Sequence, residues 1–300
     1  MQPARGPQAA EFTQAAHHLR TLAAAMTWHL TNLDELAVNG SHAARDLRNH
    51  RYDCAWGNAT FELAWEPSAR LTAISDHVAG LAAVTEAEGV VLSVATLTRP
   101  ALEGLAALHW LYEPDIELRE RVRRRYGLRL QSLGEQHAIA RTLGADARDQ
   151  VAQKVFDIRA SAHRFSYRYV YVASRFRAQP AGRYLDRRVP SGTRLISNVI
   201  EHGDQEKLGP LVHRVTSAVV HGQVHGLLPF LQDRQPGATP GVGIAAIGVS
   251  LPFYATLTGA VVLASNQTML RLCDHFGWSR RQWNDIAQPA LALWRGWLSG

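Results

Sequence analysis

The chain has 300 residues, of which 46% are hydrophobic and 19% are charged, as is ordinary for a globular protein with a sizeable core. Its formal charge of +6 is carried almost wholly by arginine, and a basic balance alone is weak support for nucleic-acid binding. Two cysteines in unrelated contexts, Cys54 and Cys273, exclude a disulfide framework, and the first residues contain no apolar signal core, so we expect a cytoplasmic location.

The first elements are predicted from the helical spacing of apolar residues. Residues 8–39 should form a long amphipathic helix that ends at Asn39-Gly40, and residues 69–88 should form a second helix. The stretch between them, residues 40–67, breaks this pattern. We expect it to be a short helix or an ordered loop, with Pro67 as a break.

Residues 89–113 allow two interpretations. Valine and threonine before Pro100 could form a strand that a helix follows. We favour one helix that is kinked at Pro100 and stopped by Pro114, because the apolar pattern continues through the proline. A strongly basic helix is predicted next, capped by Asp115 and running to Leu143-Gly144.

The middle of the chain continues with a helix over residues 146–165. Residues 166–193 are rich in Tyr, Arg, Pro and Gly and are expected to form a loop region. The alternation within residues 167–172 also allows a short strand there. Ser191 or Thr193 can cap the helix that follows.

The last third should hold a helix over residues 205–228, a loop over 229–240 and two further helices, the second at 278–297. The first of the two lies in residues 241–265, a segment without any charged residue that is long enough to cross a bilayer. Pro252, glycines and hydroxyls dilute its apolarity, so we favour a buried core helix over a membrane span.

These elements predict an all-α fold, a multi-helix bundle of about eight helices. We expect a single helical domain over residues 1–300, because no convincing linker separates two cores. Its centre should lie at about residues 70–230, with the helix at 8–39 and the helices within 241–298 packed on it.

The predicted helix at 205–228 carries an unusual density of polar side chains on an apolar segment. If the helix is continuous, four of them share one face, which we call the polar stripe: Arg214, Ser217, His221 and His225. Imidazole titrates near neutral pH, and a guanidinium can stabilise a phosphate or an oxyanion. We therefore predict a polar site with His221 as general acid or base. A histidine that is merely satisfied within the core is the alternative.

Arg99 and Glu103 lie four residues apart on the helix around Pro100, among apolar neighbours. Buried charges need partners, so a second polar helix should face this pair, and the polar stripe is the natural candidate, through Ser217 and His221. The alternative is a surface pair that contributes a few tenths of a kcal/mol.

Other kinds of site have weaker support. His221 and His225 have the spacing of a zinc pair, and a third ligand could come from His213, His202 or Asp204. The sequence lacks the glutamate of a His-Glu-x-x-His motif, however, so we expect no metal. We find no phosphate-binding loop and no nucleophile elbow, and we expect no cofactor. The arginines of residues 119–129 and five later arginines could follow a phosphate backbone, although interspersed acidic residues favour a solvated charged face. The later arginines are Arg175, Arg177, Arg183, Arg187 and Arg188.

Two segments resemble a known superfamily. Thr98-Arg99-Pro-Ala-Leu-Glu103-Gly-Leu-Ala-Ala and Ser217-x-x-x-His221-Gly222 are similar to helices of proteins related to the HEPN superfamily, whose Arg-to-His signature Arg214 and His221 match. The resemblance covers about residues 70–230. It implies a helical bundle and a metal-independent ribonuclease of toxin or phage-defence systems. The arginine and histidine of two protomers would meet at a dimer interface, activate a ribose 2′-hydroxyl and stabilise the phosphate.

Three functions follow as hypotheses. The first is a dimeric HEPN-like ribonuclease of a defence or toxin type, with His221 as general acid or base, Arg214 at the phosphate and Ser217 positioning the scissile group. The second is an enzyme for a small organic substrate, in an apolar helical-bundle pocket with these polar and substrate-binding residues: Arg99, Glu103, Ser217, His221, His225, Trp110 and Tyr254. The third is a non-catalytic binding or scaffold protein. The expected partners are RNA or a small molecule and a second copy of the chain, with no membrane.

Overall fold

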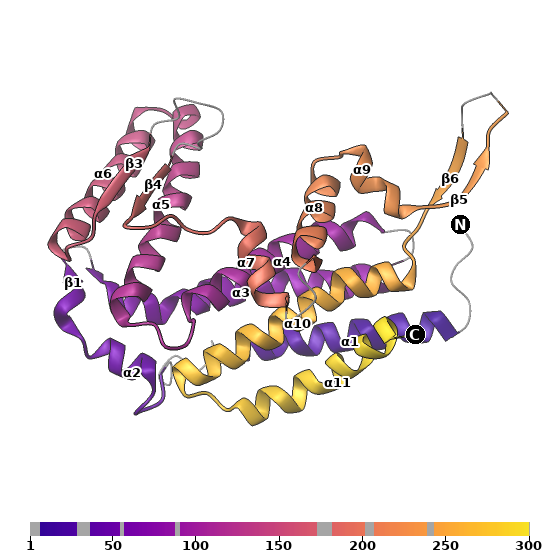
Figure 1. Cartoon of the computed structure of the whole chain (residues 1–300), viewed down its shortest axis with the longest axis horizontal. Helices are drawn as coiled ribbons and strands as arrows, with labels where there is room; N and C mark the ends of the chain where they lie inside the picture. The colour runs from indigo at the N-terminus through magenta and orange to yellow at the C-terminus, as the bar shows by residue number, and fades with distance from the viewer. Residues whose placement is uncertain are drawn as a thin grey trace. The chain divides into compact units, whose positions relative to one another are not determined.

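The computed structural model of the chain describes residues 7–28, 37–54, 57–87, 91–172, 182–201, 207–238 and 243–299 (Figure 1). The described residues fall into two compact units. Unit 1 draws on Met1–Ser41, Pro67–Trp110 and Ser191–Gly300, and unit 2 draws on His42–Glu66 and Leu111–Pro190. The single domain expected over residues 1–300 stays a prediction.

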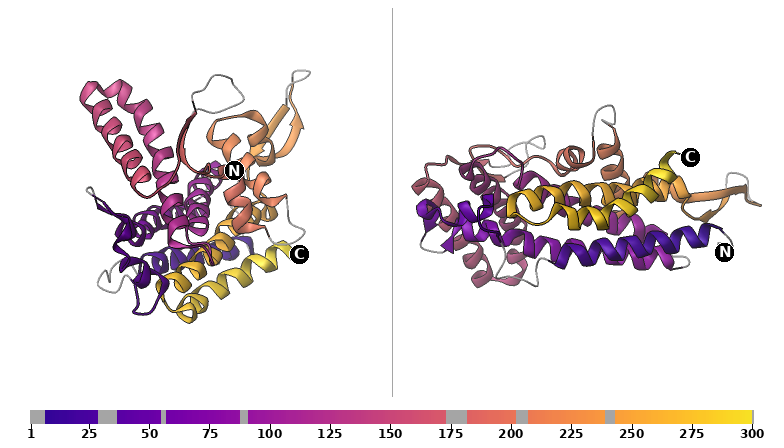
Figure 2. Two further views of the ribbon diagram at one scale, coloured as in Figure 1. Left: turned by 60° about the vertical axis from the view of Figure 1, so that its left-hand side comes forward. Right: turned by 90° about the horizontal axis from the view of Figure 1, so that it is seen from below.

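Unit 1 consists mainly of long helices. They are α1 (Pro7–Trp28), most of α3 (Ala59–Glu86), α4 (Leu92–Leu111), α7 (Gly192–Ile200), α8 (Leu208–Val220), α9 (Val224–Leu227), α10 (Leu251–Phe276) and α11 (Arg280–Ser299). A short 3-10 turn, Leu228–Phe230, leads into an antiparallel hairpin of β5 (Leu231–Pro236) and β6 (Gly243–Ile247). This hairpin projects from the helices of its unit (Figure 1 and Figure 2).

Helix α10 is largely buried, and two of its buried polar side chains are paired with neighbouring helices. Thr268 Oγ1 donates a hydrogen bond to the carbonyl of Leu105 in α4 at 3.2 Å, and Asn266 Oδ1 accepts one from Trp283 Nε1 of α11 at 3.1 Å. Such pairing allows a helix with few charges to lie in a core. The buried core helix expected in residues 241–265 is therefore confirmed from Leu251 on, as the first part of α10, whereas Gly243–Ile247 forms strand β6. In the part of the chain that the structure describes, no helix combines the length and apolarity that crossing a membrane requires.

Helices α1, α3 and α4 approach one another closely. The hydroxyl of Ser75 in α3 donates to the carbonyl of Ala23 in α1 at 2.8 Å. Between α3 and α4, Gly104 makes room for Ile74, because a Cβ at Gly104 would lie 2.7 Å from Ile74 Cγ1. This packing holds α4 against the rest of unit 1.

Unit 2 combines two long helices with small antiparallel ladders. Its elements are α2 (His42–Leu47), a 3-10 turn (His50–Tyr52), β1 (Asp53–Cys54), β2 (Gly57–Asn58), the start of α3, α5 (Leu118–Leu143), α6 (Ala145–Arg164), β3 (Tyr169–Val172) and β4 (Gly182–Leu185). Strands β3 and β4 pair with Tyr169 opposite Leu185. Gly144, with a φ of +112°, separates α5 from α6, as the predicted end of the basic helix requires.

The prediction of an all-α protein is confirmed in its coarse form, because helices dominate both units. The number of helices differs, since the described residues form eleven α-helices rather than about eight. The single helices expected over residues 89–113, 146–165 and 278–297 are confirmed as α4, α6 and α11. The helix expected over residues 8–39 is described as α1; Leu30, Leu33 and Leu36, which we placed in it, lie outside the described residues.

Pro67 does not break the chain as predicted, because it lies inside α3. A proline within a helix leaves the carbonyl four residues earlier without its usual N–H donor. Here that carbonyl belongs to Leu63, and it accepts a hydrogen bond from the hydroxyl of Tyr112. A side chain from a later segment thus satisfies the backbone group that the proline leaves free.

The N-cap of α5 and two expected loops also differ from the prediction. Asp115 does not cap the basic helix, because it has a φ of +63° and Glu117 occupies the N-cap position of α5. The expected loop at 166–193 contains β3 and β4, so the alternative of a short strand is confirmed. The expected loop at 229–240 contains β5.

Candidate functional site

The polar stripe is not one face of a continuous helix, and this prediction is wrong. Helix α8 ends at Val220, His221 is its C-cap, and Gly222 has a φ of +61° before the chain resumes as α9. A left-handed glycine at this position ends a helix, because it turns the backbone away from the helical path. His225 therefore lies on a separate short helix, and Arg214, His221 and His225 are all exposed.

The buried face of α8 is formed by Val212, Thr216 and Val219, which recur at helical spacing. His213 follows Val212 directly and is half-buried, at the flank of this apolar face. The phase of the helix therefore turns His213 toward the neighbouring helices.

The charged pair on α4 forms as predicted, with Arg99 Nε 2.9 Å from Glu103 Oε1. The side chains are 22% and 40% exposed, respectively, so the pair is neither a fully solvated surface pair nor fully buried. A polar helix does face it, as expected, but the residue that reaches the pair is His213 rather than Ser217 or His221. Its Nε2 atom lies 3.8 Å from Glu103 Oε1.

The other ring nitrogen of His213 meets a hydroxyl. Thr193 Oγ1 lies 3.0 Å from His213 Nδ1. Thr193 belongs to the first turn of α7, which Ser191 caps by accepting a hydrogen bond from Arg194 N at 3.3 Å. The imidazole is thus held between a hydroxyl and a carboxylate. We call Thr193, His213, Glu103 and Arg99 the His213 cluster.

Close packing of α7 on α8 fixes this geometry. A Cβ at Gly209, in the first turn of α8, would lie 2.6 Å from Ser197 Cα of α7, so only glycine allows this approach. The N–H of Gly209 donates to Glu201 Oε1 at 2.7 Å, which ties the end of α7 to the start of α8. Both contacts lie close in sequence to the segments that carry Thr193 and His213.

The electrostatic surroundings favour a neutral imidazole. Burial lowers the pKa of His213 below its ordinary value of 6.5, the positive charge of Arg99 lowers it further, and Glu103 opposes both effects. A neutral ring has one nitrogen that accepts a proton, which is the form that a general base needs. In the same cluster, Arg99 Nη1 is buried and has no hydrogen-bond acceptor among the described residues. It is a donor that an entering anionic oxygen could use.

The remaining predicted site residues of unit 1 lie elsewhere in the fold. Ser217 is half-buried on α8, and Trp110 is buried at the end of α4. Tyr254 is 1% exposed, its hydroxyl lies 2.7 Å from Thr85 Oγ1, and burial raises its pKa to about 12. The ring of Phe12 packs edge-on against it at 5.0 Å. Tyr254 is therefore a core residue.

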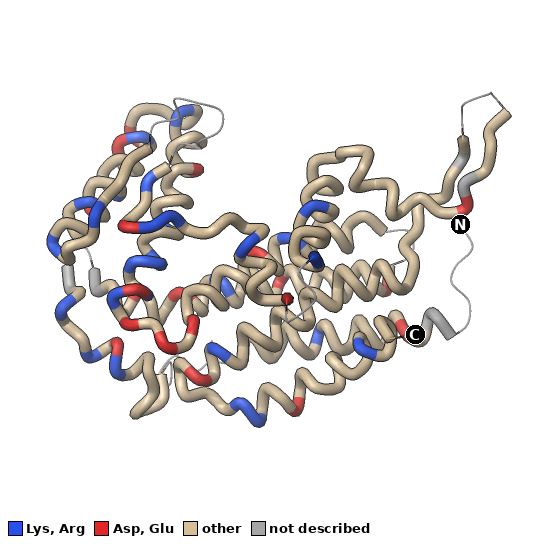
Figure 3. The backbone as a smooth tube through the Cα atoms, in the orientation of Figure 1, with Lys and Arg blue, Asp and Glu red and all other residues tan. Residues whose placement is uncertain are grey.

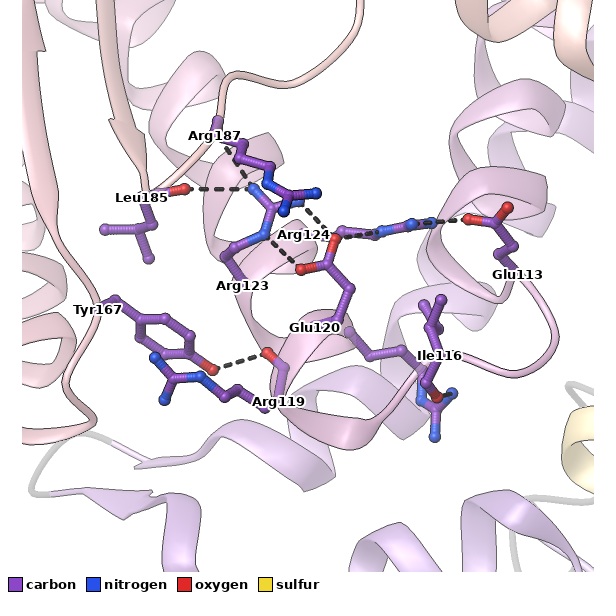
Figure 4. Close-up of polar contacts among 10 residues, drawn as sticks. Glu113, Ile116, Arg119, Glu120, Arg123, Arg124, Tyr167, Leu185 and Arg187 are labelled. Atoms are coloured by element: carbon purple, nitrogen blue, oxygen red, sulfur yellow. Dashed lines mark hydrogen bonds and ion pairs between the residues drawn. The ribbon is translucent and has the colours of Figure 1, made fainter.

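The basic helix of unit 2 is not the solvated face that we expected. Arg121, Arg123 and Arg124 are each less than a tenth exposed. Figure 4 shows Glu120 between Arg123 and Arg124, with Arg123 also donating to the carbonyls of Leu185 and Arg187.

Carboxylates distant in the sequence complete these pairs. Arg121 pairs with Asp46 at 3.0 Å, Arg124 with Glu113 at 2.6 Å, and Arg125 with Glu62 at 2.6 Å. Paired in this way, these arginines are structural, and phosphate binding by them would require breaking the pairs.

The two neighbouring arginines strongly stabilise the charged form of the Glu120 carboxyl. Burial alone would raise the pKa of Glu120, but the hydrogen bonds from Arg123 and Arg124, together with their charges, lower it to about 2. At the edge of the same network the guanidinium of Arg119 lies 4.3 Å from the ring centre of Tyr167, whose hydroxyl donates to the Arg119 carbonyl at 2.7 Å.

Figure 3 shows how differently charge is distributed along the chain: α5 carries many charged positions of both signs, whereas α10 carries few. Among the described residues no three histidine, cysteine, aspartate or glutamate side chains gather in a way that could hold a metal ion. Arg175 and Arg177, considered for phosphate contacts, and His202 and Asp204, considered as metal ligands, lie outside the described residues.

Neither Thr193 nor His213 was predicted as a catalytic residue, and His213 was considered only as a third metal ligand. The sequence does contain a signal for His213, since Val212, Thr216 and Val219 mark the buried face of α8 and place His213 beside it. Thr193 was considered only as a cap.

In comparisons with known proteins, no protein-family model, no curated protein and no solved structure matches the chain.

Proposed function

We propose that the chain is an enzyme that acts on a small organic substrate by general acid–base catalysis at the His213 cluster. The observation that carries the proposal is the placement of one imidazole between a hydroxyl and a carboxylate, through opposite ring nitrogens. Nucleophile, base and orienting acid have this relationship in hydroxyl-dependent acyl transfer, whatever the fold. The half-buried position of Thr193 and His213 supports access by a small molecule.

Each residue of the cluster has a role in this chemistry. The Thr193 oxygen would attack an acyl carbon while its proton passes to His213 Nδ1, and the same proton would then leave on the departing group. Glu103 would orient the protonated ring and stabilise its charge. Arg99 and the free N–H groups at the start of α7 would favour negative charge that develops on the substrate oxygen. Water would release the acyl group by the reverse proton path.

Hydrolysis of p-nitrophenyl acetate by the purified chain tests this proposal, with mass spectrometry for an acetyl group on Thr193. Substitution His213→Ala should lower the rate at least about a hundredfold, which is the usual range for general base catalysis. Thr193→Val should abolish the adduct, and Thr193→Ser should restore it.

The matched control is His221→Ala, which removes an exposed imidazole at the C-cap of α8, the same helix that carries His213. It should leave the rate unchanged. Equal hydrolysis by the His213→Ala and His221→Ala variants would contradict the proposal, as would an acetyl adduct that persists in Thr193→Val.

A second candidate is the dimeric, metal-independent, HEPN-like ribonuclease. Its support is the exposure of both Arg214 and His221, since residues that meet their counterparts across a dimer interface must be reachable in the single chain. His221 would act as general acid or base, and Arg214 would stabilise the phosphate.

Cleavage of labelled total RNA distinguishes the two candidates. A ribonuclease of this kind should lose at least about a hundredfold in rate on His221→Ala or Arg214→Ala. His163→Ala, which removes an exposed imidazole in the last turn of α6, is the matched control and should cleave normally. Cleavage that survives His221→Ala would exclude this candidate.

A further inference from the structure

A second candidate site in unit 1 is an apolar groove of about 910 Å³. Its floor is the face of α10 that carries Thr256, Gly259 and Leu263, and its sides come from the start of α8 and the second half of α11. Its volume lies within the usual range for small-molecule sites. No member of the His213 cluster lines it, so the inference is independent of the proposed function.

Small residues and an anchored tryptophan shape the groove. A Cβ at Gly259 would lie 2.9 Å from Trp294 Cδ1, so glycine lets the indole lie directly on α10. Trp294 Nε1 donates to Thr258 Oγ1 at 2.8 Å, and the side chain is 2% exposed. The indole is therefore a fixed wall of the groove rather than a mobile lid.

The groove leaves apolar side chains in contact with solvent. Leu211 of α8 is 51% exposed, and Leu298 of α11 is 56% exposed. Exposed leucines that line a concave apolar surface are typical of ligand sites, because a bound apolar group removes them from water.

The charged residues described along the groove have one sign. Lys207, at the N-cap of α8, and Arg295, on α11, are both exposed, and among the residues that the structure describes no acidic side chain belongs to the lining. Apolar walls with two exposed cations match a molecule that has an apolar chain and an anionic head. We propose that this groove binds a single-chain carboxylate amphiphile, with its chain along α10 and its head at Lys207 and Arg295.

Calorimetric titration of the full chain with dodecanoate, below its critical micelle concentration, tests the proposal. Dodecanol has the same chain without the charge and should bind about tenfold more weakly, because it lacks the charge-assisted hydrogen bonds. Arg295→Gln should weaken dodecanoate binding and leave dodecanol binding unchanged. Arg281→Gln, an exposed arginine on the same helix that does not line the groove, should change neither.

The apolar part is tested by Leu211→Asp and Leu298→Asp, which place a carboxylate where the chain should lie. Each should reduce dodecanoate binding at least about tenfold without changing thermal unfolding, because both positions are exposed. Leu228→Asp, at a leucine outside the groove that is 45% exposed, is the control and should bind normally. Equal affinity for dodecanoate and dodecanol would overturn the proposal, and so would binding that survives both groove variants. Binding of an acidic amphipathic helical peptide in place of dodecanoate would also overturn it.

Discussion

His213 and Glu103 approach each other from helices that are far apart in the sequence, and their atoms Nε2 and Oε1 lie 3.8 Å apart. The distance is longer than a hydrogen bond, while Arg99 holds the same carboxylate oxygen at 2.9 Å. The carboxylate is therefore hydrogen-bonded to the guanidinium and acts on the imidazole through its charge. Protonation of the ring would strengthen this attraction, which is the behaviour expected of a residue that orients a general base.

The first prediction concerns the titration of His213, followed through its ring resonances by NMR and assigned with His213→Gln. The midpoint should lie below 6.5 because burial and Arg99 both lower the pKa. Arg99→Gln removes a cause that lowers the pKa, so the midpoint should rise. Glu103→Gln removes the cause that raises it, so the midpoint should fall further. A shift of the His213 midpoint in the same direction in both variants would contradict these assigned causes.

Part of the cluster could be predicted from the sequence. Two opposite charges four residues apart in an apolar helix require a polar partner, and this requirement led to Arg99, Glu103 and the helix predicted at residues 205–228. The choice of histidine on that helix could not be made in the same way. The stripe was read from spacing over the whole predicted helix at residues 205–228, but α8 ends at Val220, and its apolar face alone decides which side chains turn inward.

Other errors have a common physical cause, since they depend on contacts between segments distant in the sequence. Pro67 was predicted as a break because proline interrupts the helical pattern locally, yet the Tyr112 hydroxyl satisfies the carbonyl of Leu63 that the proline leaves free. The arginines of α5 were taken as solvated because nearby glutamates share their helix. Partners such as Asp46, from an earlier helix, draw Arg121 into the interior.

The second prediction concerns Glu120, whose carboxylate is held between Arg123 and Arg124. Glu120→Gln should destabilise the chain by about 2 kcal/mol near neutral pH, because it leaves the poorly exposed guanidinium of Arg123 without its ionic partner. Because the pKa is lowered from 4.5 to about 2, the contribution is present above pH 4.5 and is lost as the pH falls toward 2. Denaturant unfolding of both proteins across this range should show the difference shrinking.

The control for this substitution is Glu135→Gln, on an exposed position of the same helix. It should change stability by no more than about 0.5 kcal/mol at any pH. A difference between Glu120→Gln and the unsubstituted chain that persists unchanged at pH 2 would show that the carboxylate charge is not what stabilises the network.

The third prediction concerns the buried hydrogen bond between Trp294 Nε1 and Thr258 Oγ1. Thr258→Val keeps the shape of the side chain but leaves the indole N–H without its acceptor, which should cost about 1–3 kcal/mol. Thr256→Val, on the same helix, removes a hydroxyl that bonds only its own helix backbone at Pro252, and should change stability by about 0.5 kcal/mol or less. Thermal unfolding of the two variants provides the comparison. An equal loss of stability in both would contradict the prediction.

The fourth prediction concerns Gly209, where α7 and α8 approach most tightly around the cluster. Gly209→Ala would place a Cβ 2.6 Å from Ser197 Cα, so the helices must separate, at a cost of about 1–3 kcal/mol. Gly134→Ala adds the same methyl group to a helix with open space around it and should instead stabilise the chain by about 0.5–1 kcal/mol. Because separation of the helices would also lengthen the contact between Thr193 and His213, the titration midpoint of His213 should move in Gly209→Ala and not in Gly134→Ala. A destabilised Gly209→Ala chain with an unchanged midpoint would mean that this close approach stabilises the fold without positioning the imidazole.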